Sequence, residues 1–182
     1  DINNINYLKN IIFKDYVYSP NYKIMQLLID SGIESKTLNE SLLVAVSRGD
    51  LECVKFLINN GAEVNTVGNI YHCDPNIPLF FACAKGYLDI AKLLIDNGAN
   101  VNARDRSHDT ALHYACMNGR LGAAKLLIDS GADVNATEDH DLTALILACR
   151  RGDLNTAKLL IDNGANVNAR AKSYRYVEGL SD

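Results

Sequence analysis

The sequence predicts an all-α fold, a solenoid of stacked helix-turn-helix units, because one block of residues recurs along it. The phrase Leu-Leu-Ile-Asp-x-Gly-Ala-x-Val-Asn occupies residues 93–102, 126–135 and 159–168. It returns every 33 residues, and a fixed period of this size is typical of a repeat array. The helices of such a unit cannot stand alone, since isolated helices below roughly 12 to 15 residues are marginal in water. They must therefore stack on copies of themselves.

Residues 103–135 show the unit most completely. Thr110 can cap a first helix by accepting a backbone N–H from its first turn. Gly119 can adopt the left-handed conformation that ends this helix and lets a second one start at Leu121, and Gly131 can end the second helix in the same way. An apolar stripe with 3- and 4-residue spacing follows the cap: Leu112, Ala115 and Cys116. The unit is predicted to be two short helices that share an apolar flank.

The same residues resemble the ankyrin repeat family, whose pattern runs Thr-Pro-Leu-His-x-Ala, then Gly, then Gly-Ala-x-Val-Asn. The matching segments are residues 110–115, Gly119 and residues 131–135. The resemblance implies helix pairs joined by β-hairpin-like loops. It also implies that a hydrogen bond between His113 and Thr110 braces the turn. Since His108 stands where the family usually has a turn glycine, we expect that hairpin to have a different backbone shape.

We expect a single domain, residues 1–182, built of consecutive repeats. They cover about residues 1–32, 33–65, 66–102, 103–135 and 136–168. The first is a degenerate N-terminal cap, whose outer face should be solvated. Helices of the second and third repeats are expected at residues 41–48, 51–59, 78–85 and 88–97. Residues 169–182 are either a tail that caps the last repeat or the start of a truncated repeat.

The connections into the second and third repeats are irregular. The length of each connection is counted from the glycine of the recurring phrase to the alanine in the next first helix. By this count the connection into the second repeat is four residues shorter than in later repeats, and the connection into the third is four residues longer. The longer one carries residues 67–75, and both neutral variation and a contact surface remain open for it. In the fourth repeat, Gly122 lies inside a second helix, where glycine costs about 1 kcal/mol relative to alanine. This glycine predicts a less stable repeat.

Composition indicates a globular protein without membrane insertion. Of 182 residues, 48% are hydrophobic and 22% charged, the formal net charge is −4, and no apolar run approaches the roughly 18 residues that span a bilayer. The five cysteines include no C-x-x-C pair. We expect Cys83, Cys116 and Cys149 to form a buried column rather than a disulfide, because packed helices lie about 8 to 10 Å apart. Buried thiols fit a reducing compartment, the cytoplasm or the nucleus.

No motif in the sequence predicts catalysis or a cofactor. The common phosphate-binding, dinucleotide-binding, zinc-protease and serine-hydrolase patterns are missing from it. His72, Cys73 and Asp74 could bind a metal in principle, but they do not make a complete ligand set. We therefore expect a non-catalytic protein-protein interaction scaffold or adaptor. The alternative is a regulatory or targeting segment of a larger enzyme or of a host-directed effector protein.

The resemblance implies a concave binding face, formed by hairpin tips and the outward ends of first helices. The residues assigned to the tips are Arg104, Arg106, Ser107, Asp109, Asp139, His140 and Leu142. Those assigned to the helix ends are Arg48, Lys85, Met117, Asn118, Arg150 and Arg151.

Basic side chains recur on this face although the whole chain is acidic. They predict a protein partner with an acidic segment. We expect the chain itself to be a monomer. The alternative is that charged residues simply occupy positions that face water. Nucleic acid is not the expected partner, because the net charge is −4 and the sequence has no lysine-rich stripe with interleaved aromatic residues.

Overall fold

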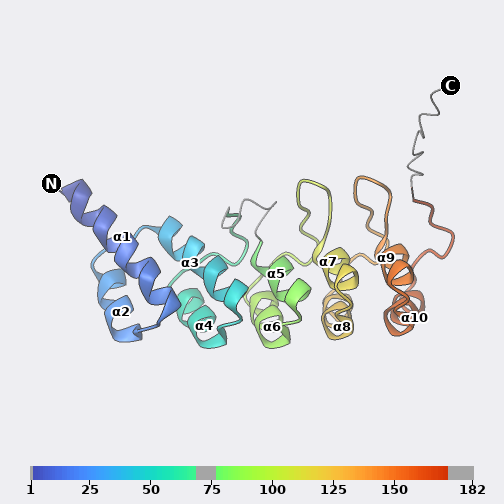
Figure 1. Ribbon diagram of the computed structural model, residues 1–182, viewed down its shortest axis with the longest axis horizontal. Coiled ribbons are helices and arrows are strands. Elements are labelled where there is room, and N and C mark those ends of the chain that lie inside the picture. Colours follow the sequence, from blue (N-terminus) through green and yellow to red (C-terminus); the bar gives the residue numbers. More distant parts are fainter. Residues whose placement is uncertain (1, 69–76, 172–182) are drawn as a thin grey trace, which may run out of the picture.

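The structure, a computed structural model, describes residues 2–68 and 77–171, with side chains from Tyr7 onward. Its described part contains ten helices in five neighbouring pairs, set side by side in one row (Figure 1). The pairs are α1 (Ile2–Tyr18) with α2 (Tyr22–Asp30), α3 (Ser35–Arg48) with α4 (Leu51–Asn59), α5 (Pro78–Lys85) with α6 (Leu88–Asp96), α7 (Ala111–Met117) with α8 (Leu121–Asp129), and α9 (Ala144–Arg151) with α10 (Leu154–Asp162). The predicted all-α solenoid is confirmed.

The fourth pair shows how local sequence sets the helix boundaries. The hydroxyl of Thr110 accepts a hydrogen bond from the backbone N–H of His113 at 3.4 Å, and the backbone N–H of Thr110 donates to Nδ1 of His113 at 3.1 Å. This reciprocal pair satisfies donors that a helix N-terminus leaves without partners. Gly119 and Gly131 have φ values of 63° and 88°, in the left-handed region that glycine enters without steric cost. Both glycines end their helices as predicted.

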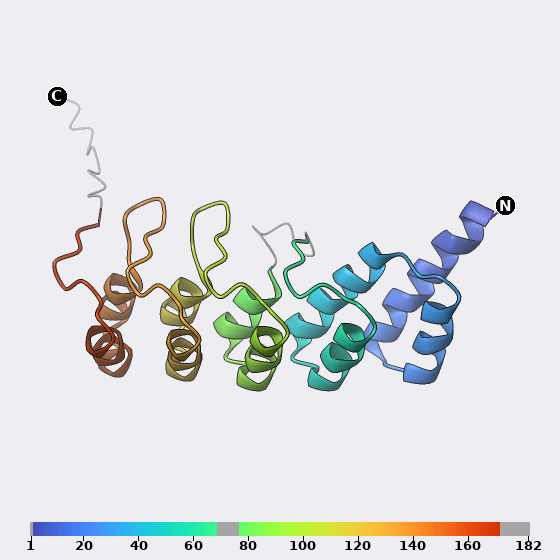
Figure 2. The ribbon, with the colours of Figure 1, turned by 180° about the vertical axis from the view of Figure 1, so that it is seen from behind.

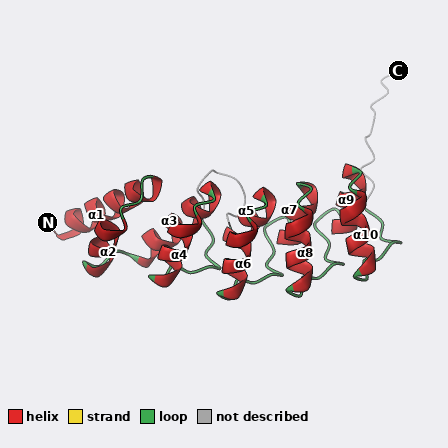
Figure 3. Cartoon of the chain, turned by 90° about the horizontal axis from the view of Figure 1, so that it is seen from below, coloured by secondary structure: helices red, strands yellow, loops and turns green. Residues whose placement is uncertain are grey.

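Each pair packs on the next through two rows of helices. The first helices α3, α5, α7 and α9 contact one another in order, and so do the second helices α4, α6, α8 and α10 (Figure 3). One leucine of each second helix is completely buried at equivalent positions: Leu57, Leu94, Leu127 and Leu160. Complete burial of such a side chain contributes about 1.5 to 3 kcal/mol. Each pair therefore owes much of its stability to its neighbours.

A row of asparagines crosses the joints between pairs. Nδ2 of Asn102 donates to the carbonyl of Gly131 at 3.1 Å, and its Oδ1 accepts from the N–H of Asp133 at 2.8 Å. The same two bonds are made by Asn65, with Gly98 and Asn100, and by Asn135, with Gly164 and Asn166. The asparagine that ends each closing phrase thus fixes the loop of the following unit.

The N-terminal region differs from the prediction in two ways. Helix α3 begins at Ser35 rather than near residue 41, because the short connection after α2 leads into the helix directly, without a hairpin. The outer face of the first pair is also less polar than expected. Large apolar side chains remain exposed on it: Tyr7, Leu8, Ile11, Ile12 and Leu27. Only the other flank of α1 is buried, through Phe13 and Val17.

The predicted column of buried cysteines is wrong at its last member. Cys83 and Cys116 are buried, as is Cys53, whereas Cys149 is exposed. Burial raises the pKa of Cys83 to about 12 and that of Cys116 to about 12, so both stay protonated and unreactive at neutral pH. Cys149 differs because, within the described residues, a helix pair packs on only one side of α9 and α10, the side toward α7 and α8.

Gly122 lies in a tight contact between second helices. A Cβ at this position would lie 3.0 Å from Cδ1 of Leu88 on α6. Glycine therefore allows α8 to approach α6 closely, and whether it also makes the fourth pair less stable stays a prediction.

Some expectations concern residues outside the described part. They are the metal hypothesis for His72, Cys73 and Asp74, most of the long connection at residues 67–75, and the tail from residue 172 onward. The residue boundaries of the repeats likewise stay predictions.

Candidate interaction surface

Two hairpin-like loops, residues 103–110 and 136–143, project from the side of the row that carries the first helices (Figure 2). Each loop is folded around one buried carboxylate. Oδ1 of Asp105 accepts from the N–H groups of Ser107 and Asp109 at 2.9 and 2.8 Å. The equivalent Glu138 accepts in the same way on Oε1: from His140 and Leu142, both at 2.9 Å. These carboxylates hold the loops in shape and are not available to a partner.

The tips of both loops need a residue in the left-handed region. His108 has a φ of 62°, and Asp141, at the equivalent place in the next loop, has a φ of 59°. The expectation that His108 gives its hairpin a different backbone shape is therefore wrong. The backbone adopts the conformation that glycine favours although a side chain is present, because the hydrogen bonds to the buried carboxylate fix the turn.

The two loops are also bonded to each other. The N–H of Asp139 donates to the carbonyl of Ser107 at 3.0 Å, and Nδ1 of His108 lies 2.5 Å from Oδ1 of Asp139. Nη1 of Arg104 donates to the carbonyl of Thr137 at 3.3 Å. Three predicted contact residues, Arg104, Ser107 and Asp139, therefore contribute to a rigid double hairpin.

His113 links the helix layer to this double hairpin. Its Nδ1 accepts from the N–H of Thr110, so its Nε2 carries the proton and donates to the carbonyl of Leu142 at 3.2 Å. Burial lowers the pKa of His113, which keeps the ring neutral as this pattern requires. The implied brace with Thr110 is present, and the ring additionally bonds the following loop.

The double hairpin is more acidic than the predicted face. The carboxylates in its two loops are Asp105, Asp109, Glu138, Asp139 and Asp141, against the guanidinium groups of Arg104 and Arg106. Burial, with the nearby charges of Asp105 and Glu138, raises the pKa of Asp109 to about 6. Burial would also raise the pKa of Glu138, but hydrogen bonds from Leu142 and His140 lower it. The loops therefore present a negative field to a partner at neutral pH.

The predicted basic residues at the helix ends fall into two groups. Nη2 of Arg48 donates to the carbonyl of Tyr18 at 3.2 Å, and Nη1 of Arg151 donates to the carbonyl of Met117 at 2.9 Å. These guanidinium groups cap the C-terminus of the preceding first helix, where carbonyls lack partners and the helix dipole favours a cation. By contrast, Lys85 and Arg150 are exposed and make no hydrogen bond or ion pair with described residues.

The remaining predicted residues have local roles. The amide of Asn118 donates to the carbonyl of Tyr114 at 2.8 Å, while Met117 is half-buried against the core. Arg106 and His140 also have interaction partners within the molecule. The structure brings the tip residues together at the double hairpin and distributes the helix-end residues along the row.

One more arginine belongs to this group, although it was not among the residues predicted from the sequence. Nε of Arg120 donates to the carbonyl of Ala84 at 3.1 Å, in the same way as Arg151 to Met117. Both arginines adjoin the glycine that ends a first helix, one after it and one before it. An arginine next to the glycine that ends a first helix is therefore the sequence pattern that could have predicted this capping role.

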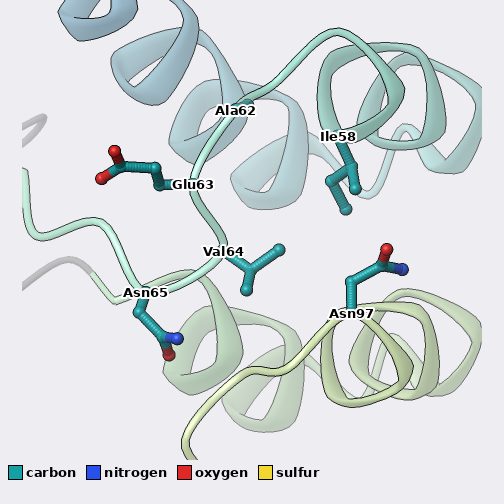
Figure 4. A pocket seen from close by; sticks show the side chains of 6 residues that line it. All are labelled: Ile58, Ala62, Glu63, Val64, Asn65 and Asn97. Carbon is teal, nitrogen blue, oxygen red and sulfur yellow. The ribbon is translucent and has the colours of Figure 1, made fainter.

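A hollow on the surface lies between the second and third pairs (Figure 4). Ile58, Ala62, Glu63, Val64, Asn65 and Asn97 line it. Figure 4 shows Ile58 and Asn97 approaching the hollow from opposite sides. Its lining has one carboxylate and two amides but no nucleophile, histidine or cation, so it offers no set of groups for acid-base catalysis.

Two classes of site find no support within residues 2–68 and 77–171. No cluster of three or more His, Cys, Asp or Glu side chains there could hold a metal ion. None of the described helices is long and apolar enough to cross a bilayer.

Comparison with known proteins agrees with the stack of helix pairs. A family model described as ankyrin repeats in three copies matches residues 15–105, 42–138 and 79–171. A stretch of 48 residues is 35% identical to a protein of Acanthamoeba polyphaga mimivirus that is named as an ankyrin repeat protein. The stretch makes up 26% of this chain and 8% of the viral protein, so it spans only a small part of that relative.

Proposed function

Because the chain belongs to the ankyrin repeat family, whose repeats generally act as protein-protein interaction modules, we propose that it binds one partner protein across its first helices and double hairpin. The observation that carries the proposal is a division of charge on this side of the molecule. Exposed cations lie at the ends of the first helices, and a rigid acidic double hairpin lies beside them.

The exposed cations that the stack does not use are the better candidates for contact. Arg48 and Arg151 already bond backbone carbonyls, so a partner would have to compete for them. Lys85 and Arg150 carry charge that no described residue neutralises. Two joints separate them, or about 16 to 20 Å at the usual helix spacing. An extended segment of roughly six residues covers that distance.

The partner segment is therefore proposed to be extended and acidic where it meets Lys85 and Arg150, with basic residues opposite the double hairpin. Such complementarity adds more to association rate and specificity than to affinity. Because the hairpins are fixed by internal hydrogen bonds, binding should need little change in the backbone of this chain.

The test uses paired charge reversals on opposite sides of the row. Lys85→Glu with Arg150→Glu should reduce capture of a specific partner by affinity purification and mass spectrometry. Lys92→Glu with Lys158→Glu makes the same change of charge on the exposed surface of the second helices and should retain it. Equal loss in both variants, or retention in both, would contradict the assigned face. If the chain instead shifted a nucleic acid in a gel, and the shift weakened with added salt, nucleic-acid binding would replace protein binding as the proposed function.

A further inference from the structure

The first helix pair, which forms one end of the row (Figure 1), exposes large apolar side chains on the side away from its core. Leu27 of α2 is 67% exposed. On α1, Tyr7 is 64% exposed, Leu8 51%, Ile12 43% and Ile11 41%. A helix that is hydrophobic on all sides is normally buried on all of them. We name these five residues the N-terminal face.

The N-terminal face occupies positions that, in later pairs, contact the preceding pair. Leu27 corresponds to Phe56, since each lies five residues before the glycine that follows its helix. The ring of Phe56 lies 5.1 Å from that of Tyr22 in the preceding pair. Ile12 corresponds to Ala144, which is 1% exposed although the fifth pair has a described neighbour only on its preceding side. The N-terminal face therefore points away from the rest of the row.

The side chains of this face do not suit a preceding ankyrin pair. Where α1 has Ile12 and Tyr16, the later first helices have small residues. In α7 these are Ala111 and Ala115, both 0% exposed. Because the distance between packed helices depends on the side chains at the contact, the alanines let α7 approach α5 closely. Ile12 and Tyr16 would hold a preceding first helix farther away.

The first pair also lacks the group with which each later pair reaches back. Arg48, Arg120 and Arg151 each donate to a backbone carbonyl of the preceding pair. At the remaining joint, Tyr87 lies against the glycine that ends α3. The turn between α1 and α2, residues 19–21, is Ser-Pro-Asn and has neither an arginine nor an aromatic ring. The N-terminal face thus differs from a stacking surface in both shape and polar groups.

The exposed apolar area is sufficient for contact between two chains. At about 200 Å² for a fully exposed residue of this size, the exposed fractions correspond to roughly 500 Å² per chain. Two such faces in contact would bury about 1,000 Å², the amount that a specific interface requires. Polar residues around the face would add to this area.

Charge does not oppose the contact of two such faces. Asp15 follows Leu8 by seven residues and Ile11 by four, so it shares their side of α1. In a two-fold arrangement with antiparallel α1 helices, centred on the face, the two Asp15 residues lie roughly 15 Å apart. This separation exceeds the Debye length of about 8 Å at physiological salt. The neighbouring Lys14 pairs with Glu40 of α3 at 2.5 Å.

We propose that the N-terminal face joins two copies of this chain in a two-fold symmetric dimer. A symmetric interface needs only one self-complementary surface, and an apolar face with well-separated charges meets this condition. Head-to-tail contact with the exposed Leu154 and Ile161 of the fifth pair does not fit, because in the internal joints the equivalent surface receives small residues and an arginine. The dimer replaces the expectation of a monomer. It does not depend on the partner proposed for the first helices and the double hairpin.

Sedimentation of the full chain over about 1 to 500 μM, a range that includes weak specific association, tests the dimer. A reducing agent is present, because the exposed Cys149 could otherwise join two chains. Leu8→Lys with Leu27→Lys puts charge on the N-terminal face. Leu154→Lys with Ile161→Lys is the matched control, since it makes the same chemical change at exposed positions of the other end.

The unchanged chain should approach twice its own mass as concentration rises. Leu8→Lys with Leu27→Lys should weaken association on the order of a hundredfold or more, as expected when charge enters the centre of an apolar interface. The control pair should associate as the unchanged chain does. Tyr7→Ser removes apolar area without adding charge and should weaken association about tenfold. Because all these positions are exposed, helical circular dichroism should be the same in every variant.

Three results would overturn the proposal. The unchanged chain could remain a monomer at every concentration, which would leave the face to a different protein. It could dimerise while the lysines at Leu8 and Leu27 have no effect. It could also form species larger than a dimer that both lysine pairs abolish, which would show head-to-tail contact between the two ends of the row.

Discussion

Two joints of the row hold neighbouring helix pairs together by different interactions. The first joint lies between α1–α2 and α3–α4, and the fourth lies between α7–α8 and α9–α10. The first has no hairpin and depends on the long helices α1 and α3, whose buried side chains include Phe13 and Leu42. The fourth has short helices and two bonded hairpins, and His113 and Asn135 carry hydrogen bonds across it. Where the connection is too short for a hairpin, burial of apolar side chains stabilises the joint in place of hydrogen bonds between neighbouring units.

This difference predicts how each joint fails. The apolar joint should respond most to loss of volume, because a cavity removes contacts that nothing replaces. The polar joint should respond to loss of a single buried donor or acceptor, whose partner then stays buried without a hydrogen bond. The following changes are ordered from the largest expected effect to the smallest.

Phe13→Ala should cost about 3 to 5 kcal/mol of unfolding free energy, because Phe13 is completely buried at the first joint. Chemical denaturation followed by circular dichroism measures this loss. Leu8→Ala on the same helix is the control, since Leu8 is 51% exposed, and it should cost far less. Equal losses would show that α1 does not pack on α3 through this flank.

His113→Ile should cost about 1 to 3 kcal/mol, because the carbonyl of Leu142 and the N–H of Thr110 lose their partner. Isoleucine is the residue at the equivalent position of the fifth pair, Ile146, so the helix itself tolerates it. A stability equal to that of the unchanged chain would remove His113 from the list of residues that hold the fourth joint.

The same variant should alter the dependence of stability on pH. Since burial lowers the pKa of His113 below 6.5, the unfolded chain binds the proton more readily. The contribution of the neutral ring is complete above about pH 6.5 and is lost as pH falls below that value. Unfolding free energies measured from pH 7.5 down to 5 should therefore fall less steeply for His113→Ile than for the unchanged chain.

Asn135→Ala should cost about 1 to 2 kcal/mol, because two backbone groups of the following loop lose their hydrogen bonds to its amide. Asn168→Ala removes the equivalent amide after α10, where its side chain bonds no described residue, and should cost little. Denaturation of both variants under identical conditions gives the comparison. A cost that is the same at both positions would contradict the bridging role.

Asp109→Asn should stabilise the chain slightly at neutral pH, by less than about 1 kcal/mol after solvent screening. The pKa of Asp109 is raised to about 6, so its ionised form opposes folding above that pH, and this penalty disappears as pH falls toward 4. Thermal melts at pH 7.5 and pH 4 should show a higher Tm for the variant only at pH 7.5. A gain at both values would point to a cause other than charge.

The sequence was sufficient for the helix pairs but not for the use of each exposed side chain. Thr110, Gly119 and Gly131 act locally, through the backbone of the next few residues, so their roles could be inferred from the one-dimensional pattern. Arg151 was assigned to partner binding, yet it caps Met117 of the preceding pair. Its side chain crosses the joint between two helix pairs, and the spacing of residues along the sequence does not give the distance across a joint.

The recurring phrase by itself determined that this chain is a stack of helix pairs and which positions are equivalent, because a fixed period maps each residue onto its counterpart. Only the tertiary structure decided which of these equivalent positions are buried to the same extent. Cys116 and Cys149 have the same local sequence role, but one is buried and the other is exposed. The physical reason is that burial depends on the neighbour that covers a surface, and each unit acquires that neighbour only on stacking.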